Sequence, residues 1–309
     1  MKIAIIGPGA MGCLFAAFLS KAKQEVWVLD KDKERSEELS RAGISVEGVS
    51  GDWHAQVQAT AKAEDIGPVD LVIVCVKSYD TRSMASGLLA LLGENTKILT
   101  LQNGIGNIEI ISEIAGNERV IGGSTNHGAT LLGTGRIRHA GKGETVIGRI
   151  DARIPVELRS IREVFNKAGL EARISRDIKG ILWSKLIINV GINALTAITR
   201  LKNGKLMAYE GTRRILRQAV TEAIRVAKRK RIKLIFEDPL AKVEAVCEAT
   251  GGNISSMLQD VLKKRKTEID FINGVIVRQG QELGIAVTVN SLLVDLVKTI
   301  EASYEERAG

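Results

Sequence analysis

A lysine and two asparagines share one face of a predicted helix in the second half of the chain. Lys185, Asn189 and Asn193 recur at every fourth position of an otherwise apolar helical pattern over residues 181–199, so they form a polar stripe about 12 Å long. A buried lysine or amide costs free energy unless it has a partner, and Asn is uncommon inside surface helices. We therefore favour a helix that lines a binding cleft; the alternative is a narrow exposed stripe without a ligand.

A glycine-rich loop follows the first predicted strand. Gly7-Pro8-Gly9-Ala10-Met11-Gly12 has the G-x-G-x-x-G pattern and opens a helical pattern. Such glycines let the backbone approach a pyrophosphate, and the helix N-terminus adds amide donors and the positive end of its dipole. A tight strand-to-helix turn would fit the loop alone. Because the second predicted strand also ends on an acidic residue, Asp30, the context favours dinucleotide binding.

Asp30 bears on the choice of cofactor. A carboxylate at this position accepts hydrogen bonds from the ribose hydroxyls and repels a 2′-phosphate, which favours NAD(H). Lys31, Lys33 and Arg35 follow at once, and they would pair with the 2′-phosphate of NADP(H) if Asp30 turned away. Four solvated surface charges are a third interpretation, so the sequence leaves this choice open.

Polar residues also follow the third, fourth and fifth predicted strands. They are Lys77, then Gln102-Asn103-Gly104, and then Ser124-Thr125-Asn126-His127. Ligands bind beyond the carboxyl ends of the strands in an open parallel sheet, so these clusters lie where a nicotinamide and its substrate are expected. Taken singly, each cluster would also serve to cap a helix or a turn.

The elements that carry these residues fall into two differently built halves. In the first half, short β-branched runs alternate with helical patterns, which predicts βαβ units and a parallel sheet covered on both faces. The predicted strands are 2–6, 25–29, 69–76, 97–101 and 120–122, with a closing hairpin of 136–139 and 144–147, and helices include 11–20 and 33–42. Long helical patterns follow, over 181–199 and about 255–283. We predict an α/β fold, with a Rossmann-type doubly wound dinucleotide-binding domain at 1–175 and an all-α substrate and catalytic domain at 176–309.

Composition agrees with two globular domains and locates the charge. A chain of 309 residues with 45% apolar side chains is long enough for two cores. Residues 1–175 carry 21 basic and 21 acidic side chains, whereas residues 176–309 carry 23 and 15, so the whole net charge of +8 lies in the second half. Long-range attraction from that half suits an anionic substrate and cofactor.

Several classes of function receive little support. No run approaches about 18 uninterrupted apolar residues, so we expect no transmembrane span, and the N-terminus does not have the pattern of a signal peptide. Three cysteines without paired spacing fit free thiols in a cytoplasmic protein. The three histidines lack metal-ligand spacing, so we expect no metal. The basic runs 228–231 and 263–266 have no interleaved aromatic residues, which favours solvated helix faces over a nucleic-acid partner.

Eight blocks in the same order along almost the whole chain resemble the ketopantoate reductase (2-dehydropantoate 2-reductase) family. They are the loop Gly7–Gly12, Lys77, Leu101-Gln102-Asn103-Gly104, Trp183-Ser184-Lys185, the segment from Asn189 to Ala197, Asn253 to Asp260, Lys266 to Gly274 and Gly284-Ile285-Ala286-Val287-x-x-Asn290. The resemblance implies reduction of 2-dehydropantoate to (R)-pantoate with a nicotinamide cofactor, on the route to pantothenate and coenzyme A. The family usually prefers NADPH, and Asp30 departs from that preference.

The resemblance also implies roles for individual residues. It makes Lys185 the general acid/base and places the catalytic glutamate at Glu268, which spacing alone would treat as a solvated helical residue. It places the other substrate-binding residues at Asn103, Asn189, Asn193, Asn203 and Ser256, and the cofactor at Gly7–Gly12, Lys77 and Asn103. The position of Asp30 at the end of the second strand adds this residue to the predicted cofactor site. The chemistry is independent of the family name, because a partly buried lysine can protonate the ketone oxygen that receives negative charge during hydride transfer.

Two other functions stay open. One is another hydroxy-acid dehydrogenase with a helical second domain, which would differ in the local sequence around its catalytic lysine. The other is a non-catalytic dinucleotide-sensing regulator, suggested by the basic second half. For the favoured function the expected partner is a small 2-oxo acid, and the long apolar helices are compatible with a homodimer.

Overall fold

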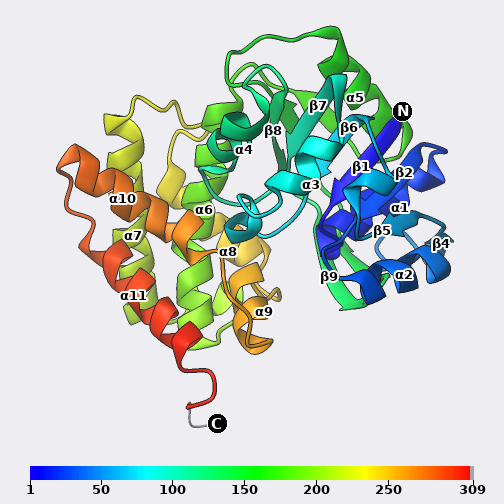
Figure 1. Ribbon diagram of the computed structural model, residues 1–309. Helices are drawn as coiled ribbons and strands as arrows, with labels where there is room; N and C mark the ends of the chain where they lie inside the picture. The colour runs from blue at the N-terminus through cyan, green and yellow to red at the C-terminus, as the bar shows by residue number, and fades with distance from the viewer. Residues whose placement is uncertain (307–309) are drawn as a thin grey trace. The chain divides into compact units, whose positions relative to one another are not determined.

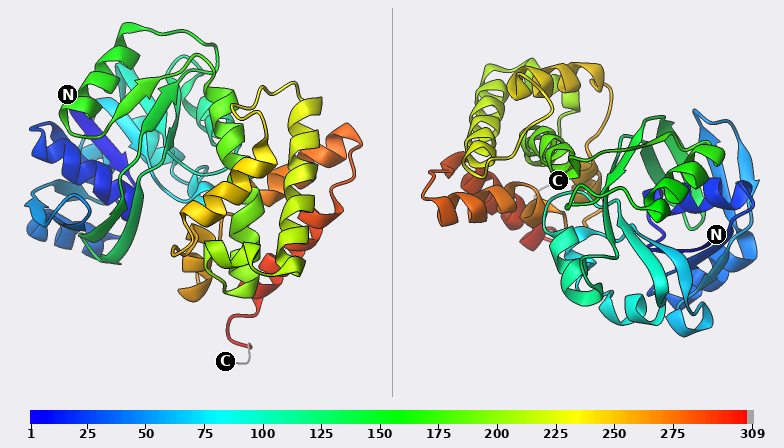
Figure 2. Two further views of the ribbon diagram at one scale, coloured as in Figure 1. Left: turned by 180° about the vertical axis from the view of Figure 1, so that it is seen from behind. Right: turned by 90° about the horizontal axis from the view of Figure 1, so that it is seen from above.

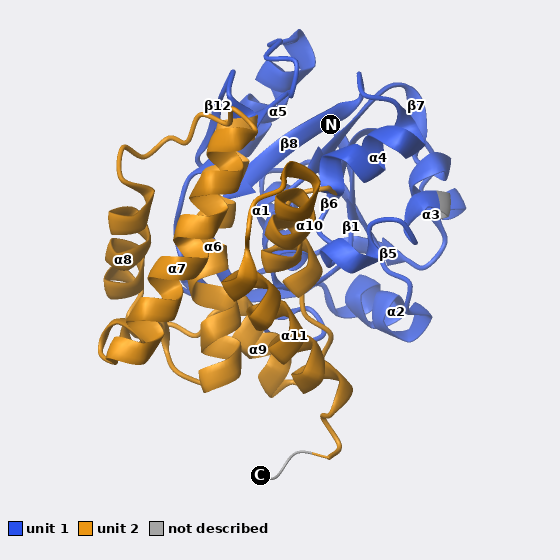
Figure 3. Ribbon diagram, turned by 90° about the vertical axis from the view of Figure 1, so that its left-hand side faces the viewer, with its two compact units in different colours: residues 1–102, 107–178 blue, residues 103–106, 179–309 orange. Residues whose placement is uncertain are grey.

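The structure, a computed structural model, describes residues 1–306, apart from the side chain of Ser86. It divides into two compact units, the first made of residues 1–102 and 107–178 and the second of residues 103–106 together with the chain from residue 179 onward (Figure 3). The second unit therefore begins three residues later than the predicted boundary. It also includes the short loop Asn103–Gly106, which the sequence places in the first half.

An eight-stranded sheet forms the centre of the first unit (Figure 1). Its spatial order is β12 (Ala172–Ile174), β11 (Thr145–Gly148), β8 (Val120–Thr125), β7 (Leu92–Thr100), β6 (Val69–Val74), β1 (Lys2–Ile6), β2 (Glu25–Leu29) and β5 (Gln58–Thr60). The strands from β8 to β5 are parallel, and β11 pairs antiparallel with β8. All five predicted strands are present, and the predicted doubly wound α/β architecture with a helical second part is confirmed.

Helices cover both faces of this sheet (Figure 2). Successive side chains of a strand point to opposite faces, so Ile3 and Ile5 of β1 pack into one core while Ala4 and Ile6 pack into the other. The first core includes α1 (Ala10–Lys21) and α5 (Val156–Lys167), and the second includes α3 (Ala85–Ala90), α4 (Asn107–Ala115) and the 3-10 turn η1 (Ala63–Asp65). Burial on both faces explains why these strands read as continuous apolar runs.

A second, four-stranded sheet corrects the predicted hairpin. Its order is β4 (Trp53–Ala55), β3 (Ile44–Gly48), β10 (Arg136–Gly141) and β9 (Gly128–Gly133). The segment 136–139 pairs here with β9 and β3, whereas 145–147 pairs with β8 and β12 in the main sheet. The hairpin prediction was wrong because the glycines at 141 and 143 mark a crossing between two sheets, which local sequence does not distinguish from a turn. Helix α2 (Lys33–Ala42) completes the unit.

The described part of the second unit is helical and contains no strand. Its elements are α6 (Ile178–Thr199, whose first residue belongs to the first unit), η3 (Asn203–Met207), α7 (Glu210–Arg229), α8 (Pro239–Ala249), α9 (Ser256–Leu262), η4 (Ile269–Phe271), α10 (Asn273–Leu283) and α11 (Thr288–Ala302). They enclose one core that contains Leu186, Val190, Val220 and Ile276.

The predicted single helix over 255–283 was wrong. It is three pieces, α9, η4 and α10, and Lys264 between the first two has a positive φ of 50°. The run of charged residues there has ordinary helix propensity and no Gly or Pro, so the sequence carries no signal for the break. The break removes Glu268 from a continuous helix face and places it at the N-cap of η4.

Helix α6 is the one described helix long and apolar enough to cross a membrane by length and composition, with a mean hydropathy of 1.6 over its best window. The expectation of no span rested on uninterrupted runs, which Lys185 and the asparagines break. Within the structure, 72% of that window is buried against other parts of the protein, as in the core helix of a soluble domain.

Candidate active site

The glycine loop between β1 and α1 has the geometry of a phosphate-binding turn. Gly7 has a φ of +95°, and a Cβ there would lie 2.7 Å from the Val76 side chain. A Cβ on Gly12 would lie 2.1 Å from the carbonyl oxygen of Gly7, so helix and strand approach closely only without a side chain. At Gly9, by contrast, a Cβ would meet no protein atom within 4 Å. The two outer glycines therefore serve packing, whereas Gly9 faces open space that a ligand can fill.

The N-terminus of α1 is free to receive an anion. The helix begins at Ala10 with Gly9 as its N-cap, no side chain caps it, and its first turn contains no acidic residue. Its first backbone N–H groups and the positive end of its dipole thus have no competing carboxylate. Pro8 contributes a carbonyl that accepts from the Cys13 thiol at 3.4 Å, and Met11 packs against the core. The loop Gly7–Gly12 fits a pyrophosphate.

Asp30 at the end of β2 is buried and already paired. Its carboxylate accepts two bonds from the Arg35 guanidinium and one, at 3.3 Å, from the Asp32 backbone N–H. The Asp30 side chain is 2% exposed, but the Arg35 side chain is 40% exposed. Asp30 in turn raises the pKa of Arg35 through this hydrogen-bonded pair. A ligand that approaches this strand end meets the guanidinium rather than the carboxylate. The sequence did not reveal that Arg35 pairs with Asp30.

A buried polar network fixes the loops that follow β6 and β7. Gln102 donates to the Val76 carbonyl at 2.9 Å and to the Thr81 hydroxyl at 2.8 Å. Thr81 contacts Asn107 at 2.9 Å, and Asn107 donates to the Ser78 hydroxyl at 3.2 Å. Lys77, predicted as a cofactor residue, occupies the N-cap position of the 3-10 turn η2 (Ser78–Asp80), beside this network and without a side-chain capping bond. Thr81 and Asn107 were missed because their spacing in the sequence gives no pattern.

His127, which follows β8, pairs with His139 of β10. The Nδ1 atom of His127 lies 3.1 Å from Nε2 of His139, and the His127 ring meets Phe15 of α1 edge-on. Burial, with His139 as a smaller cause, lowers the pKa of His127 to about 4. His127 is therefore neutral at pH 7 and supplies a hydrogen-bonding ring rather than a charge. Thr125 accepts from the His127 backbone N–H at 3.2 Å, which fixes the turn.

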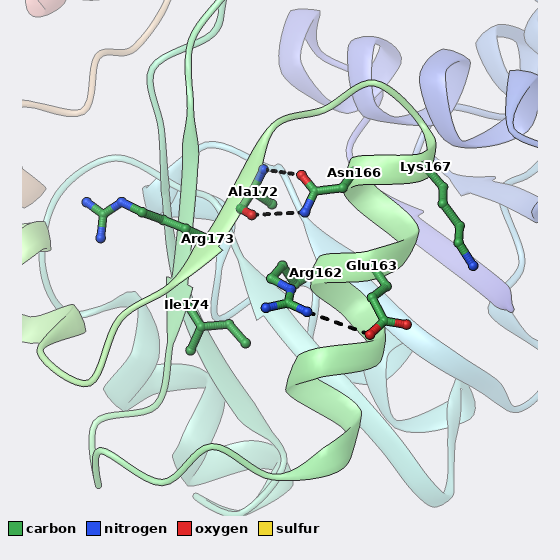
Figure 4. Close-up of a pocket in the computed structure, with 7 residues that line it drawn as sticks. All are labelled: Arg162, Glu163, Asn166, Lys167, Ala172, Arg173 and Ile174. Carbon is green, nitrogen blue, oxygen red and sulfur yellow. Dashed lines mark hydrogen bonds and ion pairs between the residues drawn. The ribbon is translucent and has the colours of Figure 1, made fainter.

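A cavity of about 580 Å³ between α5 and β12 contains none of the predicted site residues (Figure 4). It is lined by Arg162, Glu163, Asn166, Lys167, Ala172, Arg173 and Ile174. The Asn166 side chain exchanges two hydrogen bonds with the backbone of Ala172, at 3.1 and 2.8 Å. It thereby occupies the polar groups of the edge strand β12, a protection that edge strands need.

In the second unit, the polar stripe of α6 is largely buried. Lys185 and Asn189 are half-buried, and Asn193 is buried. The stripe is thus part of the interior rather than an exposed helix face. Around it, the neighbouring Ser184 hydroxyl accepts from the Ile235 backbone N–H at 3.0 Å, which ties the first half of α6 to the segment after α7.

Glu268 and Asn103 meet near this helix. The loop Asn103–Gly106 belongs to the second unit, and Asn103 Nδ2 lies 3.5 Å from Glu268 Oε2. Gly104 permits this approach, since it has a φ of +83° and a Cβ there would lie 2.4 Å from the Phe271 carbonyl. The Ile105 backbone N–H donates to the same carbonyl at 3.1 Å. Glu268 is 5% exposed, so it is not the solvated helical glutamate that spacing alone suggests.

Lys185 and Glu268 influence each other electrostatically. Burial lowers the pKa of Lys185 to about 8, and the carboxylate of Glu268 acts in the opposite direction. A charged amine loses hydration when it is buried, and a nearby anion restores part of that stabilisation. The result is a lysine whose pKa lies close to neutral pH, the range in which a side chain is well suited to transfer protons.

Ser256 and Asn203 occupy two further positions of the unit. Ser256 is the first residue of α9, whose N-cap Ser255 lies 2.6 Å, oxygen to oxygen, from Thr196 of α6. Asn203 donates from its side chain to Thr250 at 3.0 Å and from its backbone to the Asn253 carbonyl at 3.1 Å. The structure therefore anchors α9 on α6 and joins Asn203 to the loop before α9.

Two family models match the chain. "Ketopantoate reductase PanE/ApbA" matches residues 3–152, and the corresponding C-terminal model matches residues 177–301. The chain is 35% identical to a 2-dehydropantoate 2-reductase of Halobacterium salinarum over 96% of its length and 98% of the relative. It is also 34% identical to one of Vibrio cholerae, over 99% of this chain and all of the relative.

Solved structures give the same result. A PanE/ApbA family ketopantoate reductase from Ralstonia eutropha superposes with a TM-score of 0.92 at 33% identity, over 99% of this chain and all of that one. D-mandelate dehydrogenase in complex with NADH and anilino(oxo)acetate superposes with a TM-score of 0.91 at 28% identity and the same coverage. With the glycine loop, the lysine stripe and Glu268 in place, and with relatives aligned over their full length, this chain is an oxidoreductase that belongs to the ketopantoate reductase family.

Proposed function

We propose that the protein reduces 2-dehydropantoate to (R)-pantoate by hydride transfer from a nicotinamide cofactor, on the route to pantothenate and coenzyme A. The observation that carries the proposal is the group formed by half-buried Lys185, buried Glu268 and Asn103 in the second unit. The names of the full-length relatives support the choice of substrate.

Lys185 acts as the general acid. When bound, the cofactor supplies a hydride to the ketone carbon, and negative charge develops on the ketone oxygen. The Lys185 ammonium stabilises that charge and transfers a proton to the oxygen, a contribution worth about 10²–10⁴ in rate. Its pKa of about 8 keeps it mostly protonated at neutral pH while making the proton easier to release than that of an exposed lysine.

Polar groups around Lys185 orient the substrate. Asn189 and Asn193 lie on the same helix face as Lys185, one and two turns away, and each amide both donates and accepts hydrogen bonds. We assign these amides and the Ser256 hydroxyl to the substrate's carboxylate and carbonyl oxygens. The Glu268 carboxylate accepts a hydrogen bond from the substrate hydroxyl and attracts the Lys185 ammonium. The Asn103 side chain donates a hydrogen bond to Glu268 and so keeps the carboxylate in position. We also assign Asn203, whose side chain donates to Thr250, to substrate binding.

For the cofactor, we propose that both NADPH and NADH are used and that the Asp30–Arg35 pair decides the ratio. The 2′-phosphate of NADPH pairs with exposed Arg35 and with Lys31, which is 81% exposed. The ribose hydroxyls of NADH need the Asp30 carboxylate, so Arg35 has to release it first. Because the pair is bidentate, it neutralises the carboxylate that would otherwise repel the phosphate.

Parallel assays of the purified protein test the function. With 2-dehydropantoate and either NADPH or NADH, the loss of reduced nicotinamide absorbance should require both substrate and cofactor, and (R)-pantoate should be the product. Lys185→Ala should lose most turnover while its Kd for the cofactor changes little. Turnover close to that of the unaltered protein in this variant would contradict the assignment.

Equilibrium binding tests the cofactor proposal. Arg35→Gln should weaken NADPH binding by about tenfold, equivalent to about 1.4 kcal/mol, and leave NADH binding equal or tighter. Asp30→Asn should do the reverse, because it frees the guanidinium. Fluorescence titration with each nicotinamide gives the Kd values, and equal changes for the two cofactors in both variants would refute the role of the pair.

A related 2-hydroxy-acid dehydrogenase is the second candidate. It is favoured by the superposition on D-mandelate dehydrogenase, whose structure holds NADH and anilino(oxo)acetate. A panel of 2-oxo acids with aliphatic and aromatic side chains separates the two candidates, since a mandelate-type enzyme would reduce phenylglyoxylate faster than 2-dehydropantoate. The cytoplasmic location, the homodimer and the lack of metal, membrane and nucleic-acid partners stay predictions.

A further inference from the structure

A fully buried asparagine ties the lysine-bearing helix to the segment that carries Glu268. Asn273, the first residue of α10, donates from Nδ2 to the backbone carbonyl of Val190 in α6 at 3.2 Å and to Oδ1 of Asn290 at 3.0 Å. Both acceptor atoms are carbonyl oxygens, which cannot donate a hydrogen bond, so the atom of Asn273 that faces them must be the NH₂ nitrogen. This fixes the orientation of the amide. The side-chain oxygen Oδ1 of Asn273 is buried without a hydrogen-bond partner.

The bonds of Asn273 continue into two more helices. Asn290 in the first turn of α11 donates to the Ala219 carbonyl of α7 at 3.0 Å and to Glu222 of the same helix at 2.7 Å. The Glu222 carboxylate also accepts the backbone N–H groups of Val289 and Asn290, each at 2.9 Å. A carboxylate at a helix N-terminus satisfies donors that have no partner within the helix. Three buried side chains thus connect α6, α7, α10 and α11.

The position of Asn273 relates this network to the site. Val190 follows Asn189 directly and lies five residues, about 7.5 Å along the helix, from Lys185. Asn273 follows Glu268 by five residues, and the segment between them is held by backbone bonds from Phe271 and Ile272 to the Glu268 carbonyl, at 3.0 and 3.1 Å. One amide therefore fixes α6 against the short, rigid segment that presents Glu268.

The other end of that segment is fixed as well. The Thr267 backbone N–H donates to the Glu301 carboxylate of α11 at 2.7 Å, and the Thr267 hydroxyl accepts from the Ile269 backbone N–H at 3.2 Å. Glu268 thus has little freedom to follow α6 if the helix shifts. The bond from Asn273 to Val190 joins the backbone of α6 to the 267–273 segment.

We propose that Asn273 is a positioning residue that sets the spacing between the Lys185 ammonium and the Glu268 carboxylate. The proposal rests on the proposed function only in taking Lys185 as the acid. If Asn273 only stabilised the fold, its replacement would have the same effect on Lys185 as replacement of Asn290. If Asn273 is a positioning residue, its replacement changes the environment of Lys185 and replacement of Asn290 does not.

The chemical state of Lys185 provides a test that needs no substrate. In Asn273→Ala, α6 loses its tie to the Glu268 segment and water reaches the ammonium. Since burial is the larger of the two influences on the Lys185 pKa, relief of burial should raise it from about 8 by about one unit, toward the value of an exposed lysine. Competitive labelling of the full-length protein with acetic anhydride across pH, followed by mass spectrometry of the Lys185 peptide, measures this pKa.

Asn290→Ala is the matched control. It removes the side-chain bonds from Asn290 to Ala219 and Glu222 of α7 and the Oδ1 acceptor of the second Asn273 bond, but leaves the bond from Asn273 to Val190. It should therefore lower the Tm while the Lys185 pKa stays within 0.3 of the unaltered protein. If Asn273→Ala does not fold, Asn273→Ser keeps one donor and should give a smaller rise. A folded Asn273 variant with an unchanged or lower Lys185 pKa, or an equal rise in Asn290→Ala, would overturn the proposal.

Kinetics separate this proposal from the function itself. In a double-mutant cycle, Asn273→Ala should lower kcat about tenfold with the KM for cofactor unchanged, but should cost less than twofold in a Glu268→Gln background. Additive losses would count against positioning. If the protein does not reduce 2-dehydropantoate, the proposed function fails, while the labelling result still decides the role of Asn273.

Discussion

The rate of hydride transfer should fall by about tenfold between pH 7 and pH 9 if Lys185 donates the proton. With its pKa lowered to about 8, Lys185 is about nine-tenths protonated at pH 7 and about one-tenth protonated at pH 9. A lysine with the ordinary value of 10.5 would still be about 97% protonated at pH 9. Because the acid form is the active one, the activity is present below pH 8 and is lost as the pH rises through that value.

Replacement of Glu268 should shift the pH dependence of the rate in a direction that the structure predicts. Its negative charge favours the ammonium and therefore raises the Lys185 pKa against the larger effect of burial. Glu268→Gln should move the alkaline limb of the profile to lower pH, in addition to lowering the rate. A limb that moved to higher pH would show that the two groups do not interact in this way.

Pre-steady-state measurement is the suitable assay, because product release can hide the chemical step. A single turnover of bound reduced nicotinamide, followed by its absorbance from pH 6 to pH 10, reports hydride transfer directly. Lys179→Met, which removes an exposed lysine of the same helix, is the matched control and should leave the profile unchanged. A rate that stays flat to pH 9.5 in the unaltered protein would refute the argument.

Three further predictions follow from the site and the charge. Gly12→Ala should destabilise the fold by about 1–3 kcal/mol in denaturant titration, because its Cβ would lie 2.1 Å from the Gly7 carbonyl; unaltered stability would contradict that close packing. Gly9→Ala should keep the same Tm but weaken cofactor binding at least tenfold by fluorescence titration, since its Cβ would enter open space; an unchanged Kd would mean that no ligand fills it. The value of kcat/KM should fall with added salt if the +8 charge of residues 176–309 attracts the substrate, and a flat dependence would reduce that charge to surface solvation.

Local sequence patterns were sufficient to predict the buried strands of the first unit and the glycine loop that follows the first of them. Continuous apolar runs predicted β1 and β2 with the observed bounds, because strands buried on both faces need apolar side chains at every position. The glycine loop was also recognisable in the sequence, since Gly12 packs against Gly7 only five residues away, whereas the contact of Gly7 with Val76 depends on the fold. By contrast, the predicted partner of β10 was wrong, because β10 pairs within the four-stranded sheet with β3, whose residues lie about ninety positions away in the sequence.

The site shows the same division. The sequence by itself determined the stripe of Lys185, Asn189 and Asn193, because a helix turns fixed spacing into a shared face, and family resemblance added Glu268. Only the tertiary structure decided that Glu268 is buried beside Asn103, that Arg35 occupies the Asp30 carboxylate, and that Asn273 binds the backbone of α6. The pKa of Lys185 belongs to this second group, because burial and the approach of charges are properties of the packed chain and of no segment read alone.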